Sequence, residues 1–181
     1  MSAGRWGIGG GAVVTLVVIG TWVMGPGQVD TRLWGEVRPV IEARLVADSK
    51  GSGYGETQPD LRARWFCRAE ARDLDERDGV VRAGVTTSCR EYGVRAGALV
   101  ECSGAEVPQV VRLRRDAHAD GGYRVVAREE GPDGEGSGKW VEEHFSLFAE
   151  PGPDDWASST DLEAAARAHF GLPADAPLGD C

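Results

Sequence analysis

The feature that most constrains this chain is an uncharged run of 24 residues, from Trp6 to Val29. A helix of that length spans about 36 Å, enough to cross a hydrocarbon layer roughly 30 Å thick. Trp6 and Trp22 would lie about 24 Å apart along it, a separation suited to tryptophans at the two membrane interfaces. We therefore expect residues 6–27 to form a transmembrane helix that contacts the lipid bilayer and anchors the chain.

The charge beside this segment predicts its orientation. Arg5 is the only charged side chain before it, so the positive-inside rule places residues 1–5 in the cytoplasm as a short stub. Everything from residue 28 onward is then extracytoplasmic, in a single-pass protein of the cell membrane. The alternative is a secreted protein released from a cleaved signal segment, although the Gly-Pro-Gly sequence at 25–27 is a poor cleavage site. Both alternatives export the domain.

Composition narrows the class of partner. The chain has 29 acidic and 20 basic residues, a formal net charge of -9. An acidic domain repels phosphate backbones, which argues against nucleic acid as a partner. Lysine occurs only at Lys50 and Lys139 and asparagine nowhere, which is typical of a GC-rich genome and indicates a bacterial source.

The exported part opens with a helical pattern. Asp30 is a suitable N-cap, and apolar residues follow at helical spacing from Leu33 to Leu45. Pro39 lies inside this pattern and predicts a kink, or a break near Gly35. The stretch 48–60 is rich in glycine and serine and predicts a loop.

A sheet is predicted next, because the apolar period changes to two. Expected turns at 75–79, 94–97 and 120–122 give an antiparallel meander of four or five strands, with 98–115 as one bent strand or two short ones. Neither of the first two strands places an acid or base on its inward face, which argues against catalysis. The positions expected to face inward are Trp65, Cys67, Ala69, Ala71, Val81, Ala83, Val85 and Thr87.

Short helices are expected after the sheet. A loop at 133–138 precedes a helical pattern from Trp140 to Phe148, and Thr160 with Glu163 has the form of a capping box for a last helix that ends at Phe170. The fold class is therefore α+β, with residues 28–150 as the extracytoplasmic domain. Residues 151–181 are expected to form a C-terminal helix and tail packed on it.

This order of elements resembles the nuclear-transport-factor-2-like and cystatin-like folds over residues 30–150. The stretches Val-Val-Arg-Leu at 110–113 and Gly-Tyr-Arg-Val-Val at 122–126 contribute to the resemblance. It implies a membrane-anchored bacterial ectodomain in which a kinked helix packs on a curled sheet. It also implies a cone between helix and sheet, where some members use an Asp, Tyr or His in catalysis, but no catalytic motif transfers to this chain.

Four cysteines in an exported domain predict two disulfides, and they are Cys67, Cys89, Cys102 and Cys181. The first hairpin would place Cys67 opposite Cys89, whereas the second would place Cys89 opposite Cys102. Either choice leaves Cys181 for the remaining cysteine, and a Cys67–Cys102 bond would require those two strands to be neighbours. We favour Cys67–Cys89 together with Cys102–Cys181.

The residues that could carry chemistry are scattered. His118, His144 and His169 lie far apart in sequence, and no phosphate-binding loop, nucleophile elbow or zinc-hydrolase motif occurs. We therefore expect no catalytic residues, no metal and no cofactor. The expected function is a non-catalytic ectodomain that binds an envelope protein or other ligand, or supports envelope assembly. The alternative is a pocket domain that binds or transforms a small molecule.

Overall fold

The computed structural model describes residues 29–132, 135–145 and 159–181. The predicted membrane helix at 6–27, with Trp6 and Trp22, lies outside the described residues. Over the part of the chain that is described, no helix is long and apolar enough to cross a membrane.

Helix α1 (Thr31–Ser49) begins at Asp30, whose carboxylate accepts hydrogen bonds from the N–H groups of Arg32 and Leu33 at 2.9 and 3.0 Å. Its buried residues are spaced by one helical turn: Val37, Ile41 and Leu45. The predicted break near Gly35 is wrong, because the helix runs without interruption through Pro39. The buried residues on both sides of the proline pack against one sheet, and this packing keeps the two halves in one helix.

Four long strands form the antiparallel meander that the sequence predicts: β1 (Arg64–Arg77), β2 (Val80–Arg95), β3 (Ala98–Arg115) and β4 (Tyr123–Glu130). Residues 98–115 are one strand. The first two turns are Asp78-Gly79 and Ala96-Gly97, and all four residues have positive φ, as tight two-residue hairpin turns require. A fifth strand, β5 (Leu178–Asp180), pairs in parallel with β3 and is not anticipated by the sequence.

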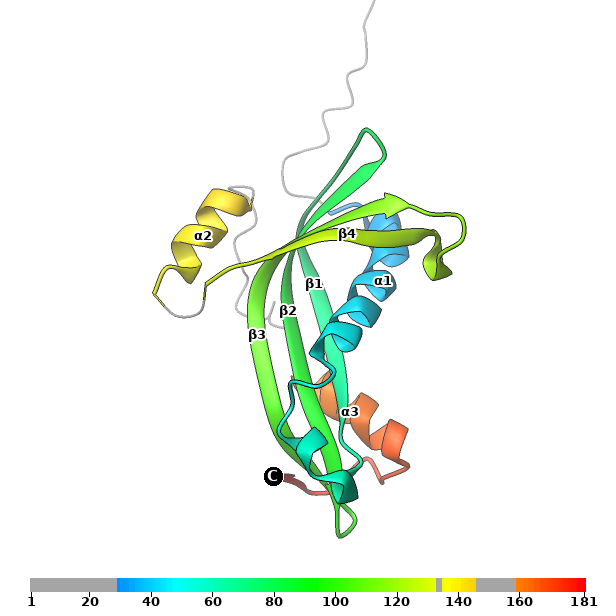
Figure 1. Cartoon of the computed structure of the whole chain (residues 1–181), viewed down its shortest axis with the longest axis vertical. Helices are drawn as coiled ribbons and strands as arrows, with labels where there is room; N and C mark the ends of the chain where they lie inside the picture. The colour runs from blue at the N-terminus through cyan, green and yellow to red at the C-terminus, as the bar shows by residue number, and fades with distance from the viewer. Residues whose placement is uncertain (1–28, 133–134, 146–158) are drawn as a thin grey trace, which may run out of the picture.

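The sheet curves because three of its four long strands contain an irregularity in their pairing. The register shifts at Arg72 in β1, at Cys102 in β3 and at Val126 in β4, where one strand has an extra residue. Such bulges bend a strand and increase its twist. Figure 1 shows α1 lying across the face of the curved strands.

The main core lies between α1 and this face of the sheet. Val37 and Ile41 pack there with Val111, Leu113 and Tyr123 from β3 and β4. The predicted inward face of the first hairpin is confirmed. Cys67, Ala69, Val81, Ala83, Val85 and Thr87 are buried, and Trp65 and Ala71 are partly buried.

The other face of the sheet is covered by two short helices, α2 (Ser137–His144) and α3 (Ser159–Phe170). The first begins inside the stretch predicted as a loop at 133–138, and the final part of the predicted 140–148 helix lies outside the described residues. The second confirms the predicted last helix, and Gly171 follows it with φ 66°. Together the three helices and five strands make an α+β fold.

Both disulfides are present in the pairing that the sequence favours, Cys67–Cys89 and Cys102–Cys181. Cys67 and Cys89 are directly paired residues of β1 and β2, with Cα atoms 4.1 Å apart. The alternative bond between Cys89 and Cys102 fails because the second turn is centred on Ala96-Gly97 and β3 bulges at Cys102, so Cys89 lies opposite Ala105.

Tyr92 generates a prediction about pH and stability. It is fully buried under α3, and its hydroxyl has no hydrogen-bond partner among the described residues. Burial raises the pKa of Tyr92 well above its usual range, and the carboxylates of Glu101 and Glu163 raise it further. The unfolded state therefore loses the proton first, near pH 10, so the free energy of unfolding falls as pH rises above that point, by at most about 1.4 kcal/mol per unit.

We expect Tyr92→Phe to change the free energy of unfolding at pH 7 by less than about 1 kcal/mol, because no hydrogen bond is lost. Between pH 9.5 and 11, urea unfolding of the variant should show a shallower loss of stability than that of the unaltered chain. Tyr54→Phe is the control, since Tyr54 is 55% exposed. A loss above 2 kcal/mol at pH 7, or an unchanged slope, would contradict this account.

Candidate functional site

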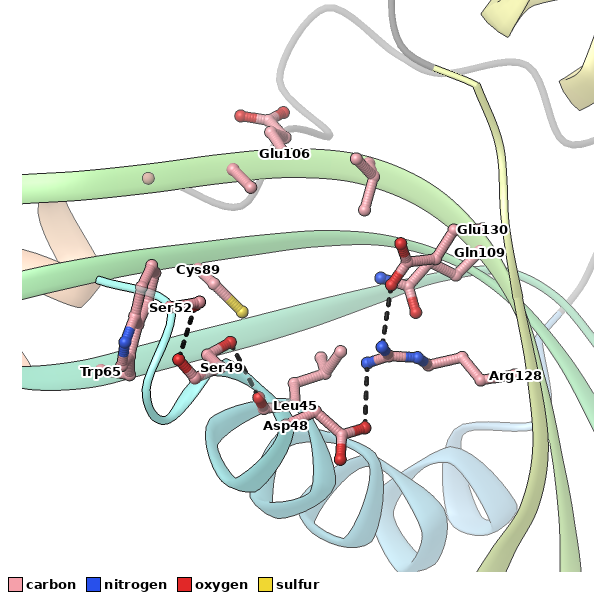
Figure 2. A pocket seen from close by; sticks show the side chains of 13 residues that line it. Leu45, Asp48, Ser49, Ser52, Trp65, Cys89, Glu106, Gln109, Arg128 and Glu130 are labelled. Atoms are coloured by element: carbon pink, nitrogen blue, oxygen red, sulfur yellow. Dashed lines mark hydrogen bonds and ion pairs between the residues drawn. The ribbon is translucent and has the colours of Figure 1, made fainter. Parts of the chain in front are cut away.

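A half-enclosed cavity of about 450 Å³ lies where the C-terminal end of α1 meets the sheet (Figure 2). Its lining comes from α1, the loop after it and all four long strands. The residues are Leu45, Asp48, Ser49, Ser52, Trp65, Cys89, Gly104, Ala105, Glu106, Val107, Gln109, Arg128 and Glu130. Ligand pockets in proteins commonly measure about 300–1,000 Å³, so this cavity is large enough for a small molecule.

Gln109 is the most deeply buried polar side chain of the cavity, with only 2% of its surface exposed. Its amide nitrogen donates to Thr87 Oγ1 at 2.9 Å, and that hydroxyl donates to the carbonyl of Val107 at 3.0 Å. Because the hydroxyl proton is used on Val107, Thr87 must accept from Gln109, which fixes the orientation of the amide. The amide oxygen of Gln109 then has no partner among the described residues.

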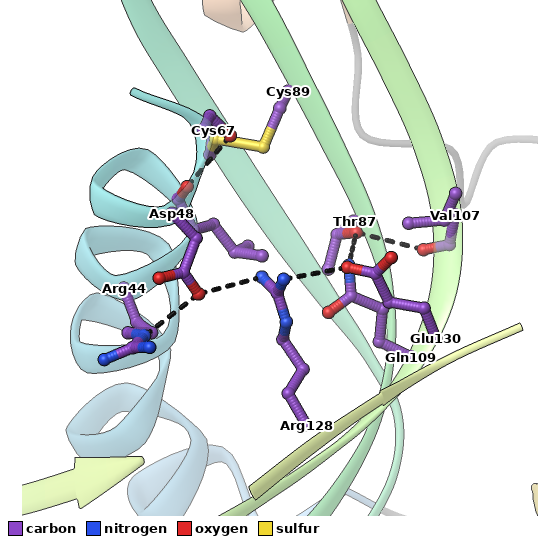
Figure 3. Close-up of polar contacts among 11 residues, drawn as sticks. Arg44, Asp48, Cys67, Thr87, Cys89, Val107, Gln109, Arg128 and Glu130 are labelled. Atoms are coloured by element: carbon purple, nitrogen blue, oxygen red, sulfur yellow. Dashed lines mark hydrogen bonds and ion pairs between the residues drawn. A yellow bond between two sulfur atoms is a disulfide. The ribbon is translucent and has the colours of Figure 1, made fainter. Parts of the chain in front are cut away.

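A chain of ion pairs crosses the cavity from α1 to β4 (Figure 3). Arg44 Nε lies 2.9 Å from Asp48 Oδ2, and the same oxygen lies 3.3 Å from Arg128 Nη1. Arg128 Nη2 lies 2.9 Å from Glu130 Oε1. The side chains of Asp48 and Arg128 are 28% and 26% exposed, so solvent screens these pairs and each stabilises the fold by roughly 0–1 kcal/mol. These ion pairs link α1 to β4 across the cavity, and breaking any one of them costs little free energy.

Trp65 closes one end of the cavity (Figure 2). It also lines a second cavity of about 560 Å³, together with Val46, Lys50, Glu56, Arg64, Phe66 and His169. The indole ring is therefore a wall between two hollows. Its N–H group is buried and has no acceptor within the described ranges.

Glu91 is paired with Trp65 across the first hairpin and is fully buried. One carboxylate oxygen accepts from the N–H of Gly55 at 2.8 Å, while the other has no partner in the described part of the chain. The loop after α1 lies directly over it, since a Cβ atom added at Gly53 would meet the Glu91 carboxyl carbon at 2.3 Å. This face of β2 thus holds an acid, which corrects the expectation that it holds none.

The sequence contained a signal for two of these residues. The alternation that places Val85 and Thr87 inward continues through Cys89 to Glu91. On β3 the same alternation places Gln109 on the face that holds Val111 and Leu113. On β4, Glu130 and Arg128 lie opposite Gln109 and Val111 because the strand has an extra residue at Val126. Extending the period of two to the ends of β2 and β3 would have found Glu91 and Gln109, but not Arg128 and Glu130, because the bulge at Val126 reverses the alternation on β4.

The three histidines lie in separate places. His118 is in the loop before β4, His144 ends α2 and His169 is near the end of α3. The His144 ring stacks on Trp140 with centroids 4.2 Å apart, and its Nε2 lies 3.3 Å from a Glu129 oxygen, so ring stacking and a polar contact account for its position. Throughout residues 29–132, 135–145 and 159–181, no group of three His, Cys, Asp or Glu side chains could hold a metal ion.

Comparison with known proteins adds no assignment: no protein-family model, no curated protein and no solved structure matches this chain.

The loop over Glu91 generates a prediction. Gly53→Ala should lower the free energy of unfolding by about 1–3 kcal/mol, because the new methyl group overlaps a buried carboxylate that has little room to move. Gly35→Ala is the matched control. Its Cβ would meet nothing within 4 Å, and alanine in a helix should stabilise the protein by about 0.5–1 kcal/mol. Equal effects of the two substitutions in urea unfolding would contradict the close packing of this loop.

Proposed function

We propose that this chain is a single-pass membrane protein whose extracytoplasmic domain binds a small polar ligand in the cavity between α1 and the sheet, without transforming it. The observation that carries the proposal is the amide oxygen of Gln109, which is buried at the floor of an open cavity and lacks a partner among the described residues. A buried acceptor without a donor costs stability. A ligand that supplies the donor removes that cost.

The composition of the cavity favours binding over catalysis. Its only cysteine, Cys89, is held in a disulfide, and it contains no histidine. Its charged groups, Asp48, Arg128 and Glu130, are held in ion pairs with one another and with Arg44. Groups held in this way can orient a ligand by hydrogen bonds. The position between a helix and a curled sheet also supports the likeness to nuclear-transport-factor-2-like and cystatin-like ectodomains, in which this cone is the pocket.

An envelope protein is the second candidate partner, and the edge of β3 favours it. This strand pairs with β5 as far as Glu101 and with β4 from Gln109 onward. Between these points, no strand of the described structure pairs with the edge of β3, and Gly104 and Ala105 are exposed. An extended segment of another protein could add to this edge by backbone hydrogen bonds.

The membrane arrangement is tested in intact bacterial cells that produce the full chain. We expect added protease to cleave the domain, and a maleimide reagent to label no thiol until a reductant is added, because the predicted segment at 6–27 exports a disulfide-bonded domain. Val17→Arg, in the middle of that segment, should reduce membrane retention, since a charge in hydrocarbon is costly. Protection from the protease together with four labelled thiols would refute the arrangement.

The cavity is tested with the full chain in detergent micelles by ligand-observed NMR against a library of small neutral and charged molecules. Val107→Trp should abolish the binding of every hit, because Val107 lines the cavity and the larger ring fills it. Val126→Trp, at a position 40% exposed on β4, should leave binding unchanged. Thermal unfolding checks that both variants fold. A library without hits, or hits that bind Val107→Trp normally, would refute the proposed site.

A further inference from the structure

The charged side chains that line the cavity are already engaged in ion pairs. Asp48 pairs with Arg44 and Arg128, and Glu130 pairs with Arg128. Glu106 pairs with Arg90 at 3.7 Å, and Figure 2 shows it pointing away from the helix. A neutral ligand leaves each of these ion pairs in place. A ligand without net charge is therefore compatible with the cavity as it stands.

The polar atoms that remain define its hydrogen-bonding pattern. The amide oxygen of Gln109, a residue that lines the cavity, is a buried acceptor without a partner among the described residues. Ser49 and Ser52 donate their hydroxyl protons to the carbonyls of Leu45 and Ser49, so their oxygens are left as acceptors. The Trp65 N–H is a donor without an acceptor in the described structure. A matching ligand must both donate and accept at several points, as hydroxyl groups do.

Trp65 adds a requirement for an apolar face. Its ring forms the end wall of the cavity and separates it from the second hollow, so one side of the indole bounds the ligand space. The face of an aromatic ring offers a large apolar surface for contact with a ligand. The ligand should then be a ring that is flat and apolar on one side and hydroxylated at its rim.

Resting on the proposed binding function, we propose that the ligand is a neutral saccharide unit. Its sugar ring lies against Trp65, one hydroxyl donates to the amide oxygen of Gln109, and further hydroxyls donate to Ser49 and Ser52. A peptide backbone is also neutral, but it offers one donor and one acceptor per residue and no hydroxylated ring, so it matches these atoms less well.

The test is titration calorimetry of the full chain in a detergent without a sugar headgroup. The saccharide probes are glucose, N-acetylglucosamine and its β-1,4-linked dimer. The comparison probes are spermidine, inorganic phosphate and an uncharged dipeptide amide. We expect heat of binding from at least one saccharide and from none of the comparison probes.

Two substitutions assign the contacts. Gln109→Leu should weaken saccharide binding about tenfold, because the acceptor is lost while Thr87 keeps its bond to Val107. Trp65→Phe should weaken it about threefold, since a ring face remains without the N–H, and Trp65→Leu should weaken it more. Trp140→Phe, on α2 at the other face of the sheet, should have no effect. Circular dichroism and thermal unfolding establish that each variant is folded.

The outcomes separate this inference from the proposed function. Binding of spermidine, phosphate or the dipeptide amide that is lost in Gln109→Leu, with no saccharide binding, would overturn the saccharide and keep the cavity as a ligand site. Saccharide binding that Gln109→Leu and Trp65→Leu leave unchanged would also overturn it, because the sugar would bind elsewhere. Failure of all probes and of the small-molecule library would overturn both.

Discussion

The structure depends on a mismatch of length between one helix and the sheet that it covers. Helix α1 has 19 residues and extends about 28 Å, whereas the 18 residues of β3 extend about 60 Å before curvature. Val37, Ile41 and Leu45 cover the part of the concave face near β4. Beyond Ser49, where α1 ends, the strands continue without an α-helix above them, and the cavity lies at that boundary.

This part of the concave face is covered by the loop after α1, which contains two short 3-10 turns at Gly55–Thr57 and Pro59–Leu61, and not by a second α-helix. The loop after α1 approaches so closely at Gly53 and Gly55 that neither position has room for a Cβ atom. It covers Glu91 and packs Leu61 against Val100, while the bond from Cys102 to Cys181 brings the C-terminal strand β5 to the same end. Glycine is required at both positions because the backbone of this loop lies in direct contact with the side chains beneath it. Larger residues would lift the loop and expose a buried carboxylate.

How much could be predicted from sequence depends on the range of the interaction. The meander and both of its early turns follow from local alternation and from residues that tolerate positive φ, as at Asp78-Gly79. The bulge at Cys102 is not readable, because it depends on the pairing of β3 with two neighbours at once, and it decides which residue faces Cys89. Strand β5 was missed because three exposed residues carry no periodic pattern. The cavity was missed because its polar residues come from strands far apart in sequence.

An open cavity at the end of a helix costs stability, since its lining lacks contacts that a filled core would make. The Cys67–Cys89 bond lies at this boundary, with Cys89 in the lining and Leu45 beside it. The disulfide joins β1 to β2 but is small, so it leaves the cavity open where a pair of larger apolar side chains would fill it. In the chain-entropy account, closing 22 residues contributes about 3 kcal/mol, which offsets part of the cost of the void. Because β1 and β2 are joined covalently before any ligand arrives, binding need not order these two walls of the cavity, and a weakly interacting ligand can be retained.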